Sequence, residues 1–260
     1  MGQSKTRVAV FGASGRMGDA LAAAARERDD CTLVAALVRR DSARLGTYMP
    51  NGELRYAATI DVPSDALVDF AGARGFDEAL ALAVEHRLAF VSGSTGLSEA
   101  QLEALTRASG TIPVMWSANF SVGVAVLKRL VAQAAELLGS EYDAEIAETH
   151  HRHKVDAPSG TALALGEAIA RARGQRFESV ARLARSGQTG ARSPGEIGFA
   201  VQRCGDVVGE HTVTFAALGE RIELAHRATS RAVFAHGALR AAAWLAQRRS
   251  GRFELADLLG

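Results

Sequence analysis

Three glycines between an apolar run and an alanine-rich segment constrain the fold of this chain most. They are spaced three residues apart: Gly12, Gly15 and Gly18. The run at 7–11 is rich in residues that favour strands, and residues 19–28 favour a helix. Residues 31–38 then predict a second strand. A strand, a glycine turn, a helix and a strand within about 30 residues indicate a βαβ unit with a parallel sheet.

The same alternation continues to about residue 120. Further strands are expected at 66–70, 89–93 and 112–116, and helices at 75–85 and 98–109. Ser98 and Gln101 have the spacing of a capping box, which places the start of the last of these helices. The pattern predicts a Rossmann-like open α/β sheet built from repeated βα units.

The pattern changes beyond residue 120 and predicts a second, smaller α+β domain with a mixed sheet. Helices are expected at 122–138 and 161–173, and strands at 143–149, 197–201, 211–216 and 221–226, the last three as a meander. The Ser-, Gly- and Pro-rich segment 185–196 suggests a mobile loop near the site. We expect a final helix at 232–247 to pack on the first domain, which gives a dinucleotide-binding domain of residues 1–121 joined by 232–260, and a substrate-binding and oligomerisation domain of residues 122–231.

Composition narrows the class of protein. A net charge of +1 and an aromatic content of 6% argue against a nucleic-acid partner. No apolar run approaches the ~20 residues that cross a bilayer, so no membrane partner is expected. The chain shows no export signal and has two cysteines, Cys31 and Cys204, which predicts a cytoplasmic location.

The glycine turn predicts a nicotinamide dinucleotide as cofactor, because it lies between a strand and a helix N-terminus, where a pyrophosphate binds. The alternative is a tight turn without a ligand. At the end of the second strand, where an acidic residue often holds the adenosine ribose, Val38 is followed by Arg39 and Arg40. Two guanidinium groups favour NADPH over NADH. If Arg39 only stacks on adenine and Arg40 is solvated, both nucleotides are used.

A cluster of histidines supplies the second half of the chemistry. Three of the seven histidines fall within four positions, at 150, 151 and 153, with Arg152 among them and Lys154 directly after them. Histidine exchanges protons near neutral pH, and the basic residues can hold an anion. A solvated basic loop is the alternative. A metal site is not expected, because the basic residues repel a cation and the two cysteines lack metal-ligand spacing.

Hydride delivery combined with proton transfer and anion binding describes reduction of a polarised double bond in an anionic substrate. Four segments resemble those of the 4-hydroxy-tetrahydrodipicolinate reductase (dihydrodipicolinate reductase) family: residues 12–18, residues 93–96, residues 118–123 and, most specifically, residues 150–162. The resemblance implies a two-domain homotetramer that reduces a cyclic dicarboxylate imine to tetrahydrodipicolinate in lysine and diaminopimelate biosynthesis.

The resemblance also assigns roles to residues. His150 would be the proton donor or acceptor, and Lys154 a second donor that polarises the ring nitrogen. His151 and the backbone of Gly160 and Thr161 would hold the small-molecule dicarboxylate substrate. The cofactor would be held at its pyrophosphate by Gly12, Ala13, Ser14, Gly15, Arg16 and Met17, at its 2′-phosphate by Arg39, and on its nicotinamide side by Gly93, Ser94, Thr95, Ser117, Ala118, Asn119 and Phe120.

This chain departs from the family at three places. Many members have an acidic residue where Val38 stands, Thr-Thr where Ser94 and Thr95 stand, and a Thr with a basic residue where Ala71 and Gly72 stand. Two other functions remain open. A semialdehyde-type dehydrogenase would need a nucleophilic cysteine, and a non-catalytic NADPH-sensing regulator would have no use for His150 and Lys154.

Overall fold

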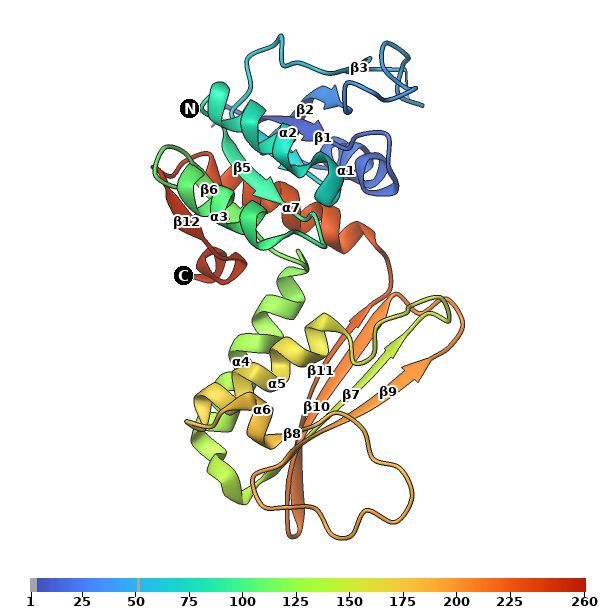
Figure 1. Ribbon diagram of the computed structural model, residues 1–260, viewed down its shortest axis with the longest axis vertical. Coiled ribbons are helices and arrows are strands. Elements are labelled where there is room, and N and C mark those ends of the chain that lie inside the picture. The colour runs from blue at the N-terminus through green and yellow to red at the C-terminus, as the bar shows by residue number, and fades with distance from the viewer. Residues whose placement is uncertain (1–3, 51) are drawn as a thin grey trace. The chain divides into compact units, whose positions relative to one another are not determined.

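The computed structural model describes residues 4–50 and 52–260 of the chain (Figure 1). The chain divides into two compact units, each with its own sheet and hydrophobic core. The first unit consists of the residues up to Val122 together with Ala232–Gly260, and the second is Gly123–Arg231. No helix in the described ranges combines the length and apolar character needed to cross a membrane.

The first unit contains a seven-stranded parallel sheet. Its strands are β1 (Thr6–Phe11), β2 (Cys31–Leu37), β3 (Tyr56–Ala57), β4 (Ala66–Asp69), β5 (Ala89–Ser92), β6 (Pro113–Trp116) and β12 (Gly251–Phe253). The order across the sheet is β12-β6-β5-β4-β1-β2-β3. The order reverses between β1 and β4, which makes this a Rossmann-like fold and confirms the predicted class. The edge strands β3 and β12 are too short to show a sequence pattern.

Helices cover both faces of this sheet. On one face α1 (Arg16–Arg26) packs against α7 (Ala232–Leu245), and on the other α2 (Ala73–Glu85) packs against α3 (Glu99–Ala108), as Figure 1 shows. A short 3₁₀ helix, η2 (Leu255–Leu259), follows β12. The capping box at the start of α3 is confirmed: the amide of Gln101 donates to Oγ of Ser98, and the amide of Ser98 donates to Oε1 of Gln101.

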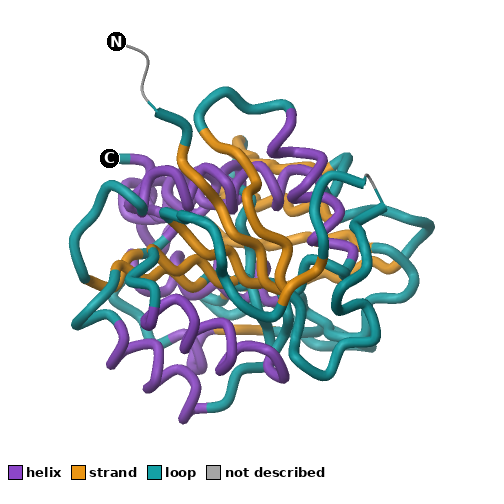
Figure 2. The backbone as a smooth tube through the Cα atoms, turned by 90° about the horizontal axis from the view of Figure 1, so that it is seen from above, coloured by secondary structure: helices purple, strands orange, loops and turns teal. Residues whose placement is uncertain are grey.

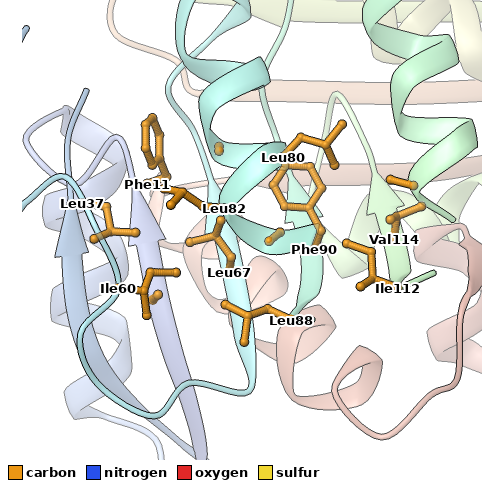
Figure 3. Close-up of a cluster of buried hydrophobic side chains, with 14 of the residues drawn as sticks. Phe11, Leu37, Ile60, Leu67, Leu80, Leu82, Leu88, Phe90, Ile112 and Val114 are labelled. Carbon is orange, nitrogen blue, oxygen red and sulfur yellow. The ribbon is translucent and has the colours of Figure 1, made fainter. Parts of the chain in front are cut away.

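The core of the first unit lies between the sheet and its helices. Figure 3 shows Phe11, Leu67, Phe90 and Val114, which come from four neighbouring strands, together with Leu80 of α2. Phe11, Leu67, Phe90 and Val114 are fully buried. Burial of each such side chain contributes on the order of 2 kcal/mol to stability. This core fixes the strands whose carboxyl ends carry the predicted cofactor residues.

The second unit contains a mixed sheet of five strands, β7 (Asp143–His150), β8 (Ala181–Arg182), β9 (Ile197–Arg203), β10 (Gly209–Ala217) and β11 (Glu220–Ala228). The helical segments are α4 (Val122–Leu138), η1 (Gly139–Glu141), α5 (Gly160–Ala172) and α6 (Phe177–Val180). Helices α4 and α5 cover one face of the sheet, as Figure 1 shows; Figure 2 colours helices purple and strands orange.

The predicted meander of three strands is wrong in its order. The sheet runs β11-β10-β7-β9-β8, so β7 lies between β9 and β10. At Ile146, β7 pairs in parallel with Phe199 of β9 and antiparallel with Val213 of β10. The parallel pair requires a crossover, which α5 provides. Spacing along the sequence does not reveal such an insertion.

The prediction that segment 185–196 lies near the histidine cluster is also wrong. Arg185 contacts Oε1 of Glu145 at 2.7 Å and Oε1 of Glu196 at 2.5 Å. Arg192 contacts Oδ1 of Asp143 at 2.8 Å. These ion pairs fasten the segment near the start of β7, whereas His150 is the last residue of that strand. Glu145 and His150 are separated by roughly 17 Å at the usual rise of a strand.

Candidate active site

The β1–α1 turn has the geometry of a phosphate-binding loop. Gly12 has a φ of 82°, and a Cβ on it would lie 2.9 Å from the amide nitrogen of Ala71 in the β4–α2 turn. Only glycine therefore allows these two turns to approach at the point where the strand order reverses. Helix α1 starts after Gly15 without a side-chain cap, so its first amides remain available to a phosphate.

The other two glycines of the motif have different roles. A Cβ on Gly18 would overlap the backbone of Ala13, so this glycine is required for packing of the helix on the turn. A Cβ on Gly15 would meet its nearest neighbour, the carbonyl oxygen of Gly12, at 3.4 Å. Gly15 is exposed, as are Ser14 and Arg16 beside it. Packing within the unit therefore does not require a glycine at position 15. A ligand that approaches the backbone closely would require one.

A buried carboxylate organises the carboxyl ends of β4 and β5. Asp69 is fully buried and accepts hydrogen bonds from Oγ of Ser92 and Oγ of Ser94, both at 2.7 Å, and from the amide of Ala71 at 2.9 Å. Burial raises the pKa of Asp69 above its usual value, although these hydrogen bonds oppose the shift. Ser94, predicted from the sequence, is thus held by a residue that the sequence analysis missed.

The rest of the expected nicotinamide side lies on neighbouring strand ends. Trp116 donates from Nε1 to the carbonyl oxygen of Ser94 at 2.8 Å, which ties β6 to this turn. A Cβ on Gly93 would overlap the ring of Phe70, which packs edge-on against Phe120 at 5.9 Å. Phe120 is buried, so its side chain serves the core, whereas Thr95 and Ala118 are exposed.

The end of β2 presents charged groups. Val38 is buried, so its side chain is part of the core and does not lie at the surface. Arg39 is half-buried, and its Nη1 lies 3.3 Å from Oδ2 of Asp41. Arg40 lies 3.7 Å from Glu78 of α2. Asp41 therefore pairs with the guanidinium that is predicted to hold the 2′-phosphate.

In the second unit, β7 ends at the histidine cluster. Glu148 and His150 are two positions apart, so their side chains lie on the same face of the strand. The carboxylate Oε2 of Glu148 is hydrogen-bonded to Nδ1 of His150. Glu148 also accepts from the amide of Ser159 at 3.0 Å and from both terminal nitrogens of Arg203 at 3.0 Å. Glu148, Ser159 and Arg203 were not singled out from the sequence.

These contacts set the charges of the pair. Burial alone would raise the pKa of Glu148, but the hydrogen bonds from Arg203, His150 and the Ser159 amide outweigh it, so its pKa is lowered. Burial lowers the pKa of His150, and the positive charges of Lys154 and Arg203 act in the same direction, against the raising effect of Glu148. The carboxylate is therefore ionised, and His150 gives up its second proton readily.

A further histidine lies behind this pair. His211 of β10 is directly opposite Glu148 in the sheet, its ring centre is 5.2 Å from that of His150, and its Nε2 is 3.1 Å from Oγ of Ser159. Burial, together with the charge of His150, lowers the pKa of His211 to about 4. Glu148, His150 and His211 each offer one atom that could bind a metal ion, and these atoms lie within 4.8 Å of one another. However, the guanidinium of Arg203 already donates hydrogen bonds to both carboxylate oxygens of Glu148, which disfavours a metal cation there.

The other predicted residues follow in the loop and the first turn of α5. Nζ of Lys154 lies 2.9 Å from Oδ1 of Asp156. The pKa of His151 is lowered by burial and by the charge of Arg231. Ser159 caps α5, accepting from the amide of Ala162 at 3.2 Å. A Cβ on Gly160 would have open space around it, so there is room for an anion at the helix N-terminus.

Comparison with known proteins identifies the family. The sequence profile described as "Dihydrodipicolinate reductase, N-terminus" matches residues 6–120, and the one described as "Dihydrodipicolinate reductase, C-terminus" matches residues 123–259.

Among solved structures, the dipicolinate-bound dihydrodipicolinate reductase from Paenisporosarcina sp. TG-14 is 21% identical, with a TM-score of 0.77 over 96% of this chain and 98% of that one. The amine dehydrogenase from Mycobacterium smegmatis is 10% identical, with a TM-score of 0.64 over 98% and 96%. An engineered D-amino acid dehydrogenase bound to NADP⁺ is 16% identical, with a TM-score of 0.55 over 99% and 96%. These identities are low, so the structures support the fold alone.

The two sequence matches account for both units of the chain. It therefore belongs to the dihydrodipicolinate reductase family and is an NAD(P)H-dependent oxidoreductase of the reduction step in lysine and diaminopimelate biosynthesis.

Proposed function

We propose that this chain reduces the cyclic dicarboxylate imine 4-hydroxy-tetrahydrodipicolinate to tetrahydrodipicolinate with NADPH as the preferred cofactor, and that His150 and Lys154 handle the proton. The observation that carries this proposal is the buried pair of Glu148 and His150 beside Lys154 and the open N-terminus of α5. The pair can exchange a proton, and the cations and the N-terminus of α5 can hold an anion.

The residues of the first unit fit a nicotinamide dinucleotide. The turn from Gly12 to Met17, with its uncapped helix, would hold the pyrophosphate. The turn Gly93–Thr95, held by Asp69, and residues 117–120 would border the nicotinamide. When bound, the cofactor supplies the hydride that adds to C4 of the substrate ring.

The residues of the second unit would hold the substrate and protonate it. The amides of Gly160 and Thr161 would donate hydrogen bonds to one carboxylate, and His151 would contact a carboxylate. The ammonium of Lys154 would polarise the ring nitrogen. His150, with Nδ1 engaged by Glu148, would exchange a proton from Nε2 at the carbon beside the site of hydride addition.

A coupled assay tests this proposal. The product of the upstream synthase is supplied, and oxidation of NADPH and NADH is followed separately. We expect substrate-dependent oxidation with a higher kcat/KM for NADPH. Lys154→Ala should lower kcat by about a hundredfold and leave the Kd for NADPH unchanged. Equal losses in turnover and cofactor affinity would contradict the role of Lys154, and no oxidation of either nucleotide by the parent protein would contradict the function.

The same assay separates the two rival functions. A semialdehyde-type dehydrogenase needs a reactive thiolate, but Cys31 is buried and burial raises the pKa of its thiol. Cys204 is exposed, so an alkylating reagent can reach it. Activity that survives thiol alkylation would exclude the dehydrogenase, and any substrate-dependent turnover would exclude a purely NADPH-sensing regulator.

We also propose a homotetramer, without nucleic-acid or membrane partners, in the cytoplasm. The face of the second sheet opposite α4 and α5 supports assembly, because β11 is exposed over most of its length while β10 alternates between buried and half-buried residues. Sedimentation equilibrium tests the assembly: a mass four times that of the 27.3 kDa chain is expected, and a monomer would contradict it.

A further inference from the structure

Arg203 contacts both segments that carry the proposed proton-handling residues. It is the last residue of β9 and lies beside His150 in the parallel pair of strands. Both of its terminal nitrogens donate to Glu148, and Nη2 also donates to the carbonyl oxygen of Asp156 at 2.6 Å. One guanidinium therefore joins the end of β7 to the loop that follows it.

The first contact controls the partner of His150. The side chain of Glu148 is 1% exposed, and an ionised carboxylate buried to this degree requires a cation nearby. Arg203 supplies that charge in a two-pronged geometry which fixes the plane of the carboxylate. The carboxylate then accepts the Nδ1 proton of His150, which leaves Nε2 as the nitrogen for exchange with substrate.

The second contact concerns Lys154. The side chain of Lys154 pairs with the carboxylate of Asp156, and Arg203 holds the backbone carbonyl of that same residue. The loop is further tied to the strand end because the amide of Arg152 donates to the carbonyl oxygen of Gly205. Both the position of the Lys154 ammonium and the tautomer of the His150 imidazole thus depend on the guanidinium of Arg203.

We propose that Arg203 is a positioning residue for both His150 and Lys154, acting on the first through Glu148 and on the second through the backbone of Asp156. This inference rests on the proposed function of His150 and Lys154. Lysine cannot replace arginine here, since one ammonium cannot make two parallel bonds to a carboxylate and a third to a carbonyl in fixed directions.

The test uses Arg203→Lys and Arg203→Met in the full chain, with Arg182→Lys as a matched control. Arg182 of β8 also pairs with a buried carboxylate, that of Glu196 just before β9, but it lies beside Gly198, at the end of β9 away from His150. We expect both Arg203 variants to lower kcat by about a hundredfold with an unchanged Kd for NADPH, and Arg182→Lys to retain kcat within about threefold. Retention of kcat in Arg203→Lys would overturn the proposal.

A spectroscopic measurement distinguishes positioning from a merely structural role. In nitrogen NMR of the parent protein, His150 should show a protonated Nδ1 with a strongly deshielded proton, and this signal should be lost in Arg203→Lys. An unchanged His150 signal in that variant would overturn the proposal. This readout needs no substrate, so it stays informative if the parent protein lacks the proposed reductase activity.

The Glu148→Gln variant tests the proposal independently if Arg203→Met fails to fold. The charged or titratable groups that face His150 are Glu148 on its own strand, Arg203 on β9, His211 on β10 and Lys154 on the loop. Removing the one negative charge should lower the pKa of His150, so the fall in kcat/KM that follows its deprotonation should move to lower pH. A profile unchanged from that of the parent protein would overturn the role of Glu148 on which Arg203 acts.

Discussion

A side chain on Gly209 would occupy the space beside His150, because its Cβ would lie 2.9 Å from Nε2 of that histidine. Nδ1 of the same ring is engaged by Glu148. Gly209, the first residue of β10, thus keeps free the one nitrogen that can exchange a proton with a ligand. The lack of a side chain at this position of β10 thus leaves room for the imidazole on the neighbouring strand β7.

Gly209→Ala should therefore lower turnover without harming the cofactor site. The φ of Gly209 is not positive, so alanine adds no backbone strain, and the methyl group acts only by displacing the imidazole. We expect a fall in kcat of about tenfold or more. Gly110→Ala is the control, because its Cβ would meet its nearest atom at 3.4 Å in the first unit. Equal kcat in both variants would contradict this account.

Protonation of His211 should destabilise the second unit in acid. Its pKa is about 4 in the folded chain and about 6.5 when unfolded, so the unfolded state binds more protons between these values. The stabilisation is complete above pH 6.5 and is lost as the pH falls towards 4, by on the order of 3 kcal/mol.

His211→Gln isolates this contribution from that of the carboxylates. The free energies of unfolding of parent and variant should converge as the pH is lowered from 6.5 to 4, at fixed protein concentration. Far-UV circular dichroism is the suitable probe, since both tryptophans, Trp116 and Trp244, belong to the first unit. A difference that stays constant over this range would show that His211 is not held neutral.

Replacement of the buried carboxylate at Asp69 should weaken cofactor binding. In Asp69→Asn an amide group would face the hydroxyls of Ser92 and Ser94, which would lose an acceptor at a cost of about 1–3 kcal/mol. We expect lower stability of the first unit, measured by tryptophan fluorescence, and a several-fold higher Kd for NADPH. Near-identical behaviour of the variant would indicate that burial keeps Asp69 protonated in the parent protein.

Cofactor preference should depend on Arg39 and Asp41. Arg39→Ala removes a charge-assisted contact to the 2′-phosphate, so kcat/KM for NADPH should fall by about tenfold or more while that for NADH changes little. Asp41→Ala releases Arg39 from an exposed ion pair of at most about 1 kcal/mol, so kcat/KM for NADPH should rise by no more than about fivefold. Parallel changes for both nucleotides would argue against the 2′-phosphate contact.

Local patterns allowed much of the fold to be predicted. The α4 helix spans the predicted residues, and Ser98 caps α3 as its spacing indicates, because helix periodicity and capping are properties of neighbouring residues. The edge strand β3 has two residues, too few to show a pattern. The place of β7 between β9 and β10 depends on long-range pairing, which one sequence does not reveal.

The same distinction applies to the candidate site. Histidines adjacent in sequence can be recognised as a cluster, and Glu148 could have been found, since it stands two positions before His150 on one face of a strand. Arg203 could not, because it is 55 residues from Glu148 and reaches it only through the parallel pairing of β7 with β9.

Removal of metal ions should leave the reductase active. Glu148, His150 and His211 form the one group among residues 4–50 and 52–260 with the spacing of metal ligands, but both oxygens of Glu148 already accept hydrogen bonds from Arg203. Prolonged dialysis against a chelator should therefore change kcat by less than about twofold, whereas added Zn²⁺ should compete with the Arg203 contact and inhibit. Loss of activity on chelation, restored by Zn²⁺, would make the cluster a metal centre and refute the role given to the imidazole.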